Sequence, residues 1–468
     1  MTVGRPFPLI LNFALPLLLG NLLIQAYNLV DAAIVGQTLG MNALAGVGAS
    51  SSLLFLILGF CGGLAGGFGI PIAQAFGAKD YVRLQRYVRA SYLWGIVFSI
   101  VLAVVCSLLC GDILRWMQTP EEIFHDAYIY LLITFISIPC NLVYNLFASI
   151  IRALGDSKTP FYALLVGSVV NIVLDFLFIM AFGMGVGGAA LATAIAQLVS
   201  IFLCLHHLKK TPSVLSDISP SMGRAVRVVL HPKTIRMVPL SIEGEGWGEG
   251  LWHVLCMGVP MGLQFSITAI GSIMLQSANN TLGTECATAF TAAMRIKMFF
   301  ICPYENLGVA LATYCGQNLG AKQYDRIRSG LKDGLLMMLI YSVFTFFVLW
   351  FFSRDISTLF IYRDETRILD LSQQFLRVSC CCYVFLGTLT VFRYSLQGIG
   401  RTKLSMFSGV SELIARCLIS LFLVPAIGFT GVCIGDPSAW FAADCFLVPT
   451  FLMILSKLNA QTRLARCL

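Results

Sequence analysis

The chain has 468 residues, of which 58% are hydrophobic and only 12% are charged, against about 25% charged residues in an ordinary soluble domain. Its mean hydropathy is +0.84. This composition excludes a soluble enzyme or binding module and indicates a protein that lies in the membrane along its whole length.

Apolar runs long enough to cross a membrane recur from one end of the chain to the other. A bilayer core of about 30 Å needs about 20 helical residues, and the runs are continuously apolar rather than alternating, which predicts helices and not barrel strands. We therefore predict an all-α integral membrane protein with twelve transmembrane helices. The first six predicted spans are 8–35, 50–75, 91–113, 127–150, 161–182 and 186–207, and the second six are 251–277, 288–314, 334–356, 370–394, 405–427 and 431–455.

The two sets of six spans belong to an internal repeat. Gly-Ala-Lys-x-Tyr follows the second span at 77–81 and the eighth span at 320–324, and Pro16 with Pro260 keeps nearly the same offset. A repeat of this kind indicates one six-helix unit present twice. Because each lobe has an even number of spans, the lobes are expected to be parallel and related by a pseudo-twofold along the membrane normal. The predicted domains are an amino-terminal lobe at 1–208, a cytoplasmic linker at 209–250 and a carboxy-terminal lobe at 251–468.

Lysine and arginine gather in the loops after even-numbered spans, for example at Lys79 and Arg83, and near both ends of the chain. The loops after odd-numbered spans carry few of them. Because cytoplasmic loops are the ones enriched in these residues, both termini are predicted to be cytoplasmic. This topology explains the net charge of +8, and no nucleic-acid partner is expected.

A few polar residues inside the first six spans are candidates for chemistry, since ionisable groups in the membrane are costly and usually functional. Asp31 lies late in span one, Asn171 and Asp175 are four apart on one face of span five, and Thr193 lies in span six. Their oxygens suit a small hard cation, and two close carboxylates can share a proton. Two alternatives stay open: the Asp caps a broken helix, or Asn171 only holds two helices together.

The second half lacks acids at the counterpart positions, where Arg416 and Ser420 align with Asn171 and Asp175. The predicted ion site is therefore not duplicated. Glu412 lies four residues before Arg416 on span eleven, a spacing that predicts a neutralising ion pair within one helix.

Several motifs identify a family when they are taken together. They are Leu15-Pro16, Val259-Pro260, Gln-x-x-Gly-Ala at 74–78 and 317–321, Ala153-Leu154-Gly155-Asp156, and Gly398-Ile399-Gly400. In this combination the chain resembles, over essentially its whole length, the multidrug and toxic compound extrusion (MATE) family of twelve-helix secondary transporters. In the branch of that family with an acidic amino-terminal lobe, the resemblance implies that the Na⁺ or proton site is made by Asp31, Asn171, Asp175 and Thr193.

The resemblance also implies a function. We expect an antiporter of a prokaryotic plasma membrane, not an enzyme, that exports lipophilic and often cationic xenobiotics in exchange for Na⁺ or H⁺ by alternating access. Its expected partners are small organic molecules and the lipid bilayer, and we expect a monomer without a cofactor other than the coupling ion. A substrate cleft of apolar and amide side chains is predicted, with the candidates Asn141, Asn145, Met261, Gln264, Phe265, Phe290 and Met294.

Three other functions were weighed against the antiporter. A lipid-linked precursor flippase of the same superfamily would have a more cationic cavity and often extra helices. A membrane-embedded enzyme would carry a metal motif or a Ser and His constellation, and the five histidines have no such spacing. A channel would carry a selectivity-filter repeat, which the sequence lacks.

Overall fold

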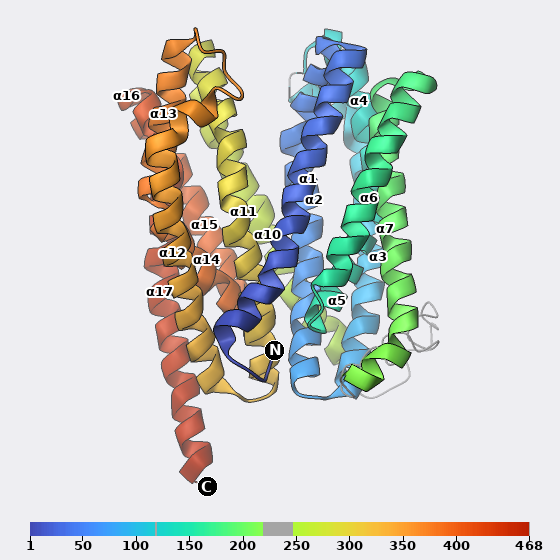
Figure 1. Ribbon diagram of the computed structural model, residues 1–468, viewed down its shortest axis with the longest axis vertical. Helices are drawn as coiled ribbons and strands as arrows, with labels where there is room; N and C mark the ends of the chain where they lie inside the picture. The colour runs from blue at the N-terminus through green and yellow to red at the C-terminus, as the bar shows by residue number, and fades with distance from the viewer. Residues whose placement is uncertain (118, 219–246, 468) are drawn as a thin grey trace. The chain divides into compact units, whose positions relative to one another are not determined.

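The computed structural model describes residues 1–117, 119–218 and 247–467 (Figure 1). Most of the predicted linker at 209–250 therefore lies outside the described residues. The described part of the first half consists of α1 Pro6–Leu39, α2 Met41–Gly77, α3 Tyr81–Trp116, α4 Glu121–Ile136, α5 Ile138–Ala153, α6 Lys158–Asp175, the π-helix η1 Phe176–Ala181 and α7 Gly185–Ile218. The second half consists of α10 Trp247–Asn280, α11 Thr284–Gly320, α12 Tyr324–Ser357, α13 Thr366–Cys381, α14 Tyr383–Gly398, α15 Thr402–Leu418, the π-helix η2 Ile419–Leu423, α16 Val424–Ile427 and α17 Phe429–Cys467.

The predicted fold class is confirmed. Over the described ranges, ten helices are long and apolar enough to cross a bilayer, and two bent pairs of helices bring the number to twelve. The bent pairs are α4 with α5, at 46°, and α13 with α14, at 51°. They correspond to the predicted spans four and ten, so the number of spans was right and the bends were not foreseen.

The repeated signature has a structural explanation. Lys79 and Lys322 take left-handed backbone angles, with φ of 58° and 57°, and are the two non-glycine residues with positive φ in the part of the chain that the structure describes. Each lies just after a long helix, where the Lys79 N–H donates to the Phe76 carbonyl and the Lys322 N–H to the Leu319 carbonyl. The same turn therefore reverses the chain in both halves.

The chain divides into two compact units that differ from the predicted domains. We call Leu15–Gly262 the amino-terminal unit, and Met1–Ala14 together with Leu263–Leu468 the carboxy-terminal unit. The chain thus passes from one unit to the other inside α1 and inside α10, within two residues of Pro16 and Pro260. The predicted boundaries at 208 and 250 follow the sequence repeat, whereas these boundaries follow the packing of the helices.

The core of the amino-terminal unit is built on α2, α3, α4 and α5, with Leu64, Phe68 and Phe135 fully buried. The first part of α10 packs closely on α2. A Cβ atom on Gly67 would lie 2.6 Å from the Gly258 Cα and from a backbone carbonyl, so these two helices touch through their backbones.

The carboxy-terminal unit buries three large tyrosines, Tyr304, Tyr314 and Tyr383, at 0% exposure. Their hydroxyl groups need partners when they are removed from water. The Tyr304 hydroxyl shares a 2.9 Å hydrogen bond with Ser342 Oγ, and the Tyr314 hydroxyl donates to the Arg326 carbonyl at 3.1 Å. These bonds tie α11 to α12.

Candidate functional site

The first candidate site begins at the end of α6. Asn171 and Asp175 lie on its buried face, with 2% and 0% of their surface exposed. Directly after Asp175 the α-helical hydrogen bonding gives way to the π-helix η1. Short π-helical segments within helices are frequent at functional sites, and this one starts at the residue that the sequence singled out.

The Asn171 amide joins two other helices. In the amide orientation that pairs each donor with an acceptor, Asn171 Nδ2 donates to Asp31 Oδ1 at 3.3 Å, and Asn171 Oδ1 accepts from the backbone N–H and the hydroxyl of Thr193, both at 3.3 Å. Asp31 comes from α1 and Thr193 from α7. The structure therefore brings these three predicted residues into direct contact inside the amino-terminal unit.

Asp175 completes the group. Its carboxyl group lies close enough to that of Asp31 to interact with it, and both of its oxygens are buried without a hydrogen-bond donor. Buried polar atoms nearly always have a partner, and two carboxylates in an apolar site repel each other unless a proton or a cation lies between them. The arrangement is therefore suited to binding one positive charge.

Two tyrosines that the sequence analysis missed also belong to this group. The phenol groups of Tyr27 on α1 and Tyr130 on α4 interact electrostatically with both carboxylates. Tyr27 could have been found, because it lies four residues before Asp31 and so on the same face of α1. Tyr130 has no such local signal, since only the packing of α4 brings it to the site.

The predicted substrate-cleft residues are divided between the two units, and their role stays a prediction. In the amino-terminal unit, Asn145 Nδ2 donates to the backbone and side-chain oxygens of Asn141, at 2.9 and 3.1 Å. Met261 is buried, with its methyl group next to Gly66. The two amides therefore already engage each other on α5.

In the carboxy-terminal unit, the Phe290 ring packs edge-on against Phe375, and Met294 places its sulfur 3.7 Å from the Lys297 amine. Phe265 is half-buried. Gln264 is 4% exposed, and its side-chain oxygen accepts from a glutamine and a serine of its own unit, as described below. Phe290 and Gln264 thus contribute to the packing of this unit.

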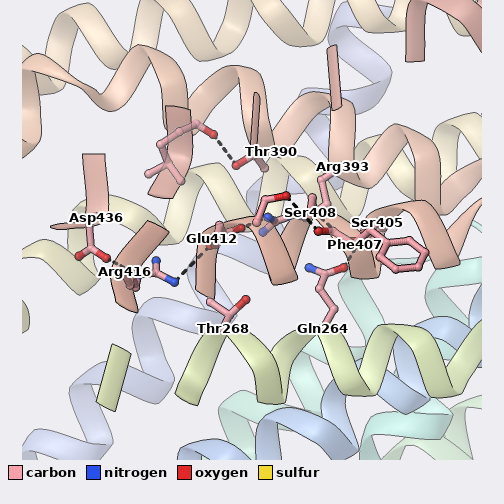
Figure 2. Close-up of polar contacts among 12 residues, drawn as sticks. Gln264, Thr268, Thr390, Arg393, Ser405, Phe407, Ser408, Glu412, Arg416 and Asp436 are labelled. Carbon is pink, nitrogen blue, oxygen red and sulfur yellow. Dashed lines mark hydrogen bonds and ion pairs between the residues drawn. The ribbon is translucent and has the colours of Figure 1, made fainter. Parts of the chain in front are cut away.

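The second candidate site is a chain of buried ion pairs in the carboxy-terminal unit. Glu412 and Arg416 do form an ion pair within α15, with Arg416 Nη1 3.4 Å from Glu412 Oε2 and both side chains at most 4% exposed. The pair is not isolated, however. Arg416 Nε also donates to Asp436 Oδ1 at 3.0 Å, and Glu412 pairs with Arg393. Figure 2 shows Arg416 between Asp436 and Glu412.

Asp436 on α17 extends this chain to α11, where it pairs with Lys297. Lys297 and Asp436 have 4% and 7% of their side chains exposed, and the Lys297 amine also lies 5.4 Å from the ring centres of Phe375 and Trp440. Sequence analysis missed Asp436 altogether. The available signal was an acid inside the last apolar span, which contains Asp436 and Asp444.

Hydroxyl and amide groups continue the polar chain to α10. Arg393 Nε donates to Ser408 Oγ at 3.1 Å. Gln397 Nε2 donates to Ser405 Oγ at 2.9 Å and to Gln264 Oε1 at 3.0 Å, and the Ser405 hydroxyl donates to the same Gln264 oxygen. We call the whole set from Lys297 to Gln264 the buried charge network.

Comparison with known proteins places the chain in a family. The family model MatE matches residues 16–177 and 260–422. Of the first candidate site, Asp31, Asn171 and Asp175 lie in the matched segments and Thr193 lies outside them. The chain belongs to the MatE family. The two matched segments also correspond to the two halves of the internal repeat, so the MatE unit is present twice.

Two relatives match this MatE chain over nearly their whole length. It is 29% identical, over 97% of this chain and 94% of the relative, to the probable multidrug resistance protein YoeA of Bacillus subtilis strain 168. It is 26% identical to the probable multidrug resistance protein YpnP of the same strain, over 95% of this chain and 94% of that protein. A crystal structure of MATE in the bent conformation has the same fold, with a TM-score of 0.84, 22% identity and 98% of both chains covered.

Proposed function

We propose that the protein is a secondary active antiporter that exports lipophilic and often cationic organic compounds, and that a proton bound between Asp31 and Asp175 is the coupling ion. The observation that carries the proposal is the grouping of half-buried Asp31 with the buried Asn171 and Asp175, in which both Asp175 oxygens lack a donor. The relatives named as multidrug resistance proteins support export of toxic compounds.

The two neighbouring carboxyl groups support a proton as the shared positive charge. In the amide orientation that satisfies every hydrogen bond of Asn171, its N–H group faces Asp31 and its oxygen accepts from Thr193. The group then binds one proton with its two carboxyl groups alone. A Na⁺ site would be expected to collect more oxygen ligands than these, whereas two carboxyl groups suffice for one shared proton.

A shared proton gives the site two states of different charge. When the proton is bound, Asp31 and Asp175 share one negative charge. When the proton leaves, the negative charge of Asp31 on α1 and that of Asp175 on α6 repel each other. Export is coupled to this change if substrate and proton bind best to opposite conformations, since each then weakens the binding of the other by the same factor.

The lysine and arginine residues that gather in alternate loops support cytoplasmic termini, because cytoplasmic loops are the ones enriched in these residues.

Transport by purified variants in lipid vesicles tests the proposal. Asp31→Asn keeps the size of the side chain and its contact with Asn171, but it can neither carry charge nor take up a proton. We expect a proton gradient to drive efflux of a fluorescent lipophilic cation by the wild type and not by this variant, while an imposed Na⁺ gradient drives neither.

Asp112→Asn is the matched control, because Asp112 is an acid on α3 with 54% of its side chain exposed and only a 3.7 Å contact with Arg115. It should transport as the wild type does. Proton-driven efflux that survives Asp31→Asn in a folded protein, or efflux driven by Na⁺ alone, would contradict the proposal.

A further inference from the structure

Arg377 on α13 is a charged residue of the membrane part that neither candidate site includes. Two interactions hold its guanidinium against α12: Arg377 Nε donates to the Trp350 carbonyl at 3.0 Å, and the central guanidinium carbon lies 5.2 Å from the centre of the Trp350 ring. The two helices pack side by side within the carboxy-terminal unit (Figure 1). The guanidinium therefore has a defined position, and its residue is partly exposed on the surface of this unit.

The uncharged stretch of α12 indicates how deep this group lies in the membrane. No charged residue lies between Asp333 and Arg354, and the 20 residues at 334–353 form a helix of about 30 Å, the thickness of the hydrocarbon core. Trp350 lies four residues before Arg354, which is about 6 Å along the helix axis. The Arg377 guanidinium is therefore expected just inside the boundary between the hydrocarbon core and the lipid head groups.

Arg377 differs from two other arginines at this end of α12 and α13 in having no acid beside it. Arg354 pairs with Asp370 at 2.6 Å, and Arg367 pairs with Glu285 at 2.8 Å. Among the residues that the structure describes, Arg377 has no carboxylate partner, and its two Nη groups have no hydrogen-bond acceptor. Because an unpaired charge in the membrane is costly, a countercharge from outside the chain is expected.

Aromatic rings cover the surface of α12 beside this arginine. Phe346 stacks on Trp350, with ring centres 5.4 Å apart, and Phe347 stacks on Phe351 at 6.4 Å. The rings of Phe346 and Phe347 meet edge-on at 5.6 Å and so join the two pairs. We call these four residues the aromatic strip. Phe347 and Phe351 are exposed, so the strip offers an apolar surface next to the cation.

We propose that Arg377 and the aromatic strip bind one anionic phospholipid, with the phosphate on the Nη groups of Arg377 and an acyl chain on the strip. A guanidinium presents paired N–H donors that match two phosphate oxygens. The depth of the group and the apolar surface beside it favour a lipid phosphate over a free phosphate ion, since a free ion has no use for the strip.

The charges at the site favour a phospholipid with a net negative charge. One unpaired cation is neutralised by one net negative charge, which phosphatidylglycerol carries. A zwitterionic lipid would also need an acid for its cationic head group. Asp370, two turns away on the same face of α13, already pairs with Arg354.

A lipid bound in this way connects two helices. Its phosphate lies on α13 and its acyl chain on α12, so binding stabilises their packing and makes the stability of the protein depend on the lipid. This inference goes beyond the proposed function and does not rest on it.

Native mass spectrometry of the purified full-length protein, with phosphatidylglycerol added in steps, tests the proposal. We expect the wild type to hold one phosphatidylglycerol molecule more tightly than any further ones. Arg377→Gln should bind this molecule about tenfold more weakly, because it loses the charge-assisted hydrogen bonds to the phosphate.

Two other variants separate the parts of the site. Arg367→Gln is the matched control, because this arginine of the same helix has 80% of its side chain exposed and pairs with Glu285; it should bind phosphatidylglycerol as the wild type does. Phe351→Ala leaves Arg377 and its contacts with Trp350 in place. It should bind roughly fivefold more weakly, because the acyl chain loses apolar contact.

Two measurements on the wild type need no variant. Phosphatidylcholine should bind about tenfold more weakly than phosphatidylglycerol, and inorganic phosphate should not displace the bound lipid.

The proposal is overturned if Arg377→Gln binds phosphatidylglycerol as the wild type does, or if Arg367→Gln loses it to the same extent. Equal binding of phosphatidylcholine, or displacement by inorganic phosphate, would overturn it as well. None of these results depends on transport. Failure of the proposed function would instead show as proton-driven efflux that survives Asp31→Asn, so the two proposals can fail separately.

Discussion

The buried pair of Lys297 and Asp436 allows a prediction about stability in which two substitutions at one contact have unequal effects. Asp436 has two cationic partners, Lys297 and Arg416, whereas among the described residues Lys297 has one carboxylate partner. Asp436→Asn therefore leaves a buried lysine without a countercharge. Lys297→Met leaves Asp436 still paired with Arg416 Nε at 3.0 Å.

The expected magnitudes follow from burial. Both side chains are at most 7% exposed, and removal of one partner of a buried ion pair costs about 3–5 kcal/mol. Asp436→Asn should lower the free energy of unfolding by this amount, which changes the unfolding equilibrium by roughly two to four orders of magnitude. Lys297→Met loses about 1 kcal/mol of contact between the amine and the Phe375 and Trp440 rings but strands no charge, so its cost should be clearly smaller.

A double-mutant cycle in detergent or bicelles, with reversible unfolding followed by tryptophan fluorescence, measures these differences. The double variant Lys297→Met with Asp436→Asn should be more stable than Asp436→Asn alone, since the unpaired ammonium group is gone. Equal costs for the two single variants, or costs that simply add in the double variant, would refute the reasoning.

Three further predictions concern other parts of the molecule. Gly67→Ala should lower the free energy of unfolding by about 1–3 kcal/mol through overpacking, since its Cβ would lie 2.6 Å from the backbone of α10. Gly62→Ala is the control and should not destabilise the protein, because a Cβ there would have nothing within 4 Å. Equal unfolding curves for the two variants would contradict the close packing of α2 on α10. Lys322→Gly should raise the free energy of unfolding by about 1 kcal/mol, because glycine adopts the φ of 57° at this position without steric cost. An unchanged midpoint of thermal unfolding would contradict the left-handed turn at Lys322. Asn171→Ala should lower proton-driven efflux in vesicles about tenfold, because it removes the contacts of this residue with Asp31 and Thr193. Ser168→Ala is the control and should transport normally, because the Ser168 hydroxyl donates to the Leu164 carbonyl of its own helix. A similar loss in both variants would indicate an effect on packing rather than on coupling.

Local patterns in the sequence predicted the features that depend on one helix at a time. Long apolar runs predicted the membrane spans, and spacing by four residues placed Asn171 with Asp175 and Glu412 with Arg416 correctly on shared faces. The grouping of Asp31 with Asn171 was proposed from the cost of polar residues in the membrane, with two structural alternatives left open, and the family resemblance then favoured it. The helical periodicity of α1 does not show which other helix Asp31 faces.

The features that were missed depend on how helices turn toward each other. Asp436 has no charged residue within four positions of it in the sequence, and only the packing of α17 against α11 and α15 makes it the partner of two cations. Tyr130 reaches the first site for the same kind of reason. The hydrogen bonds that Gln397 on α14 and Ser405 on α15 donate to the Gln264 side chain were not foreseen either, and the role of Gln264 in a substrate cleft stays a prediction.

The most direct test of the central claim is to measure whether binding of the transported compound displaces a proton from the Asp31 and Asp175 pair. Purified protein in weakly buffered solution, with a pH-sensitive dye, would be mixed with a lipophilic cation that it exports. The account predicts proton release by the wild type and by Asp112→Asn, and none by Asp175→Asn that still binds the compound. Undiminished release from Asp175→Asn would contradict it.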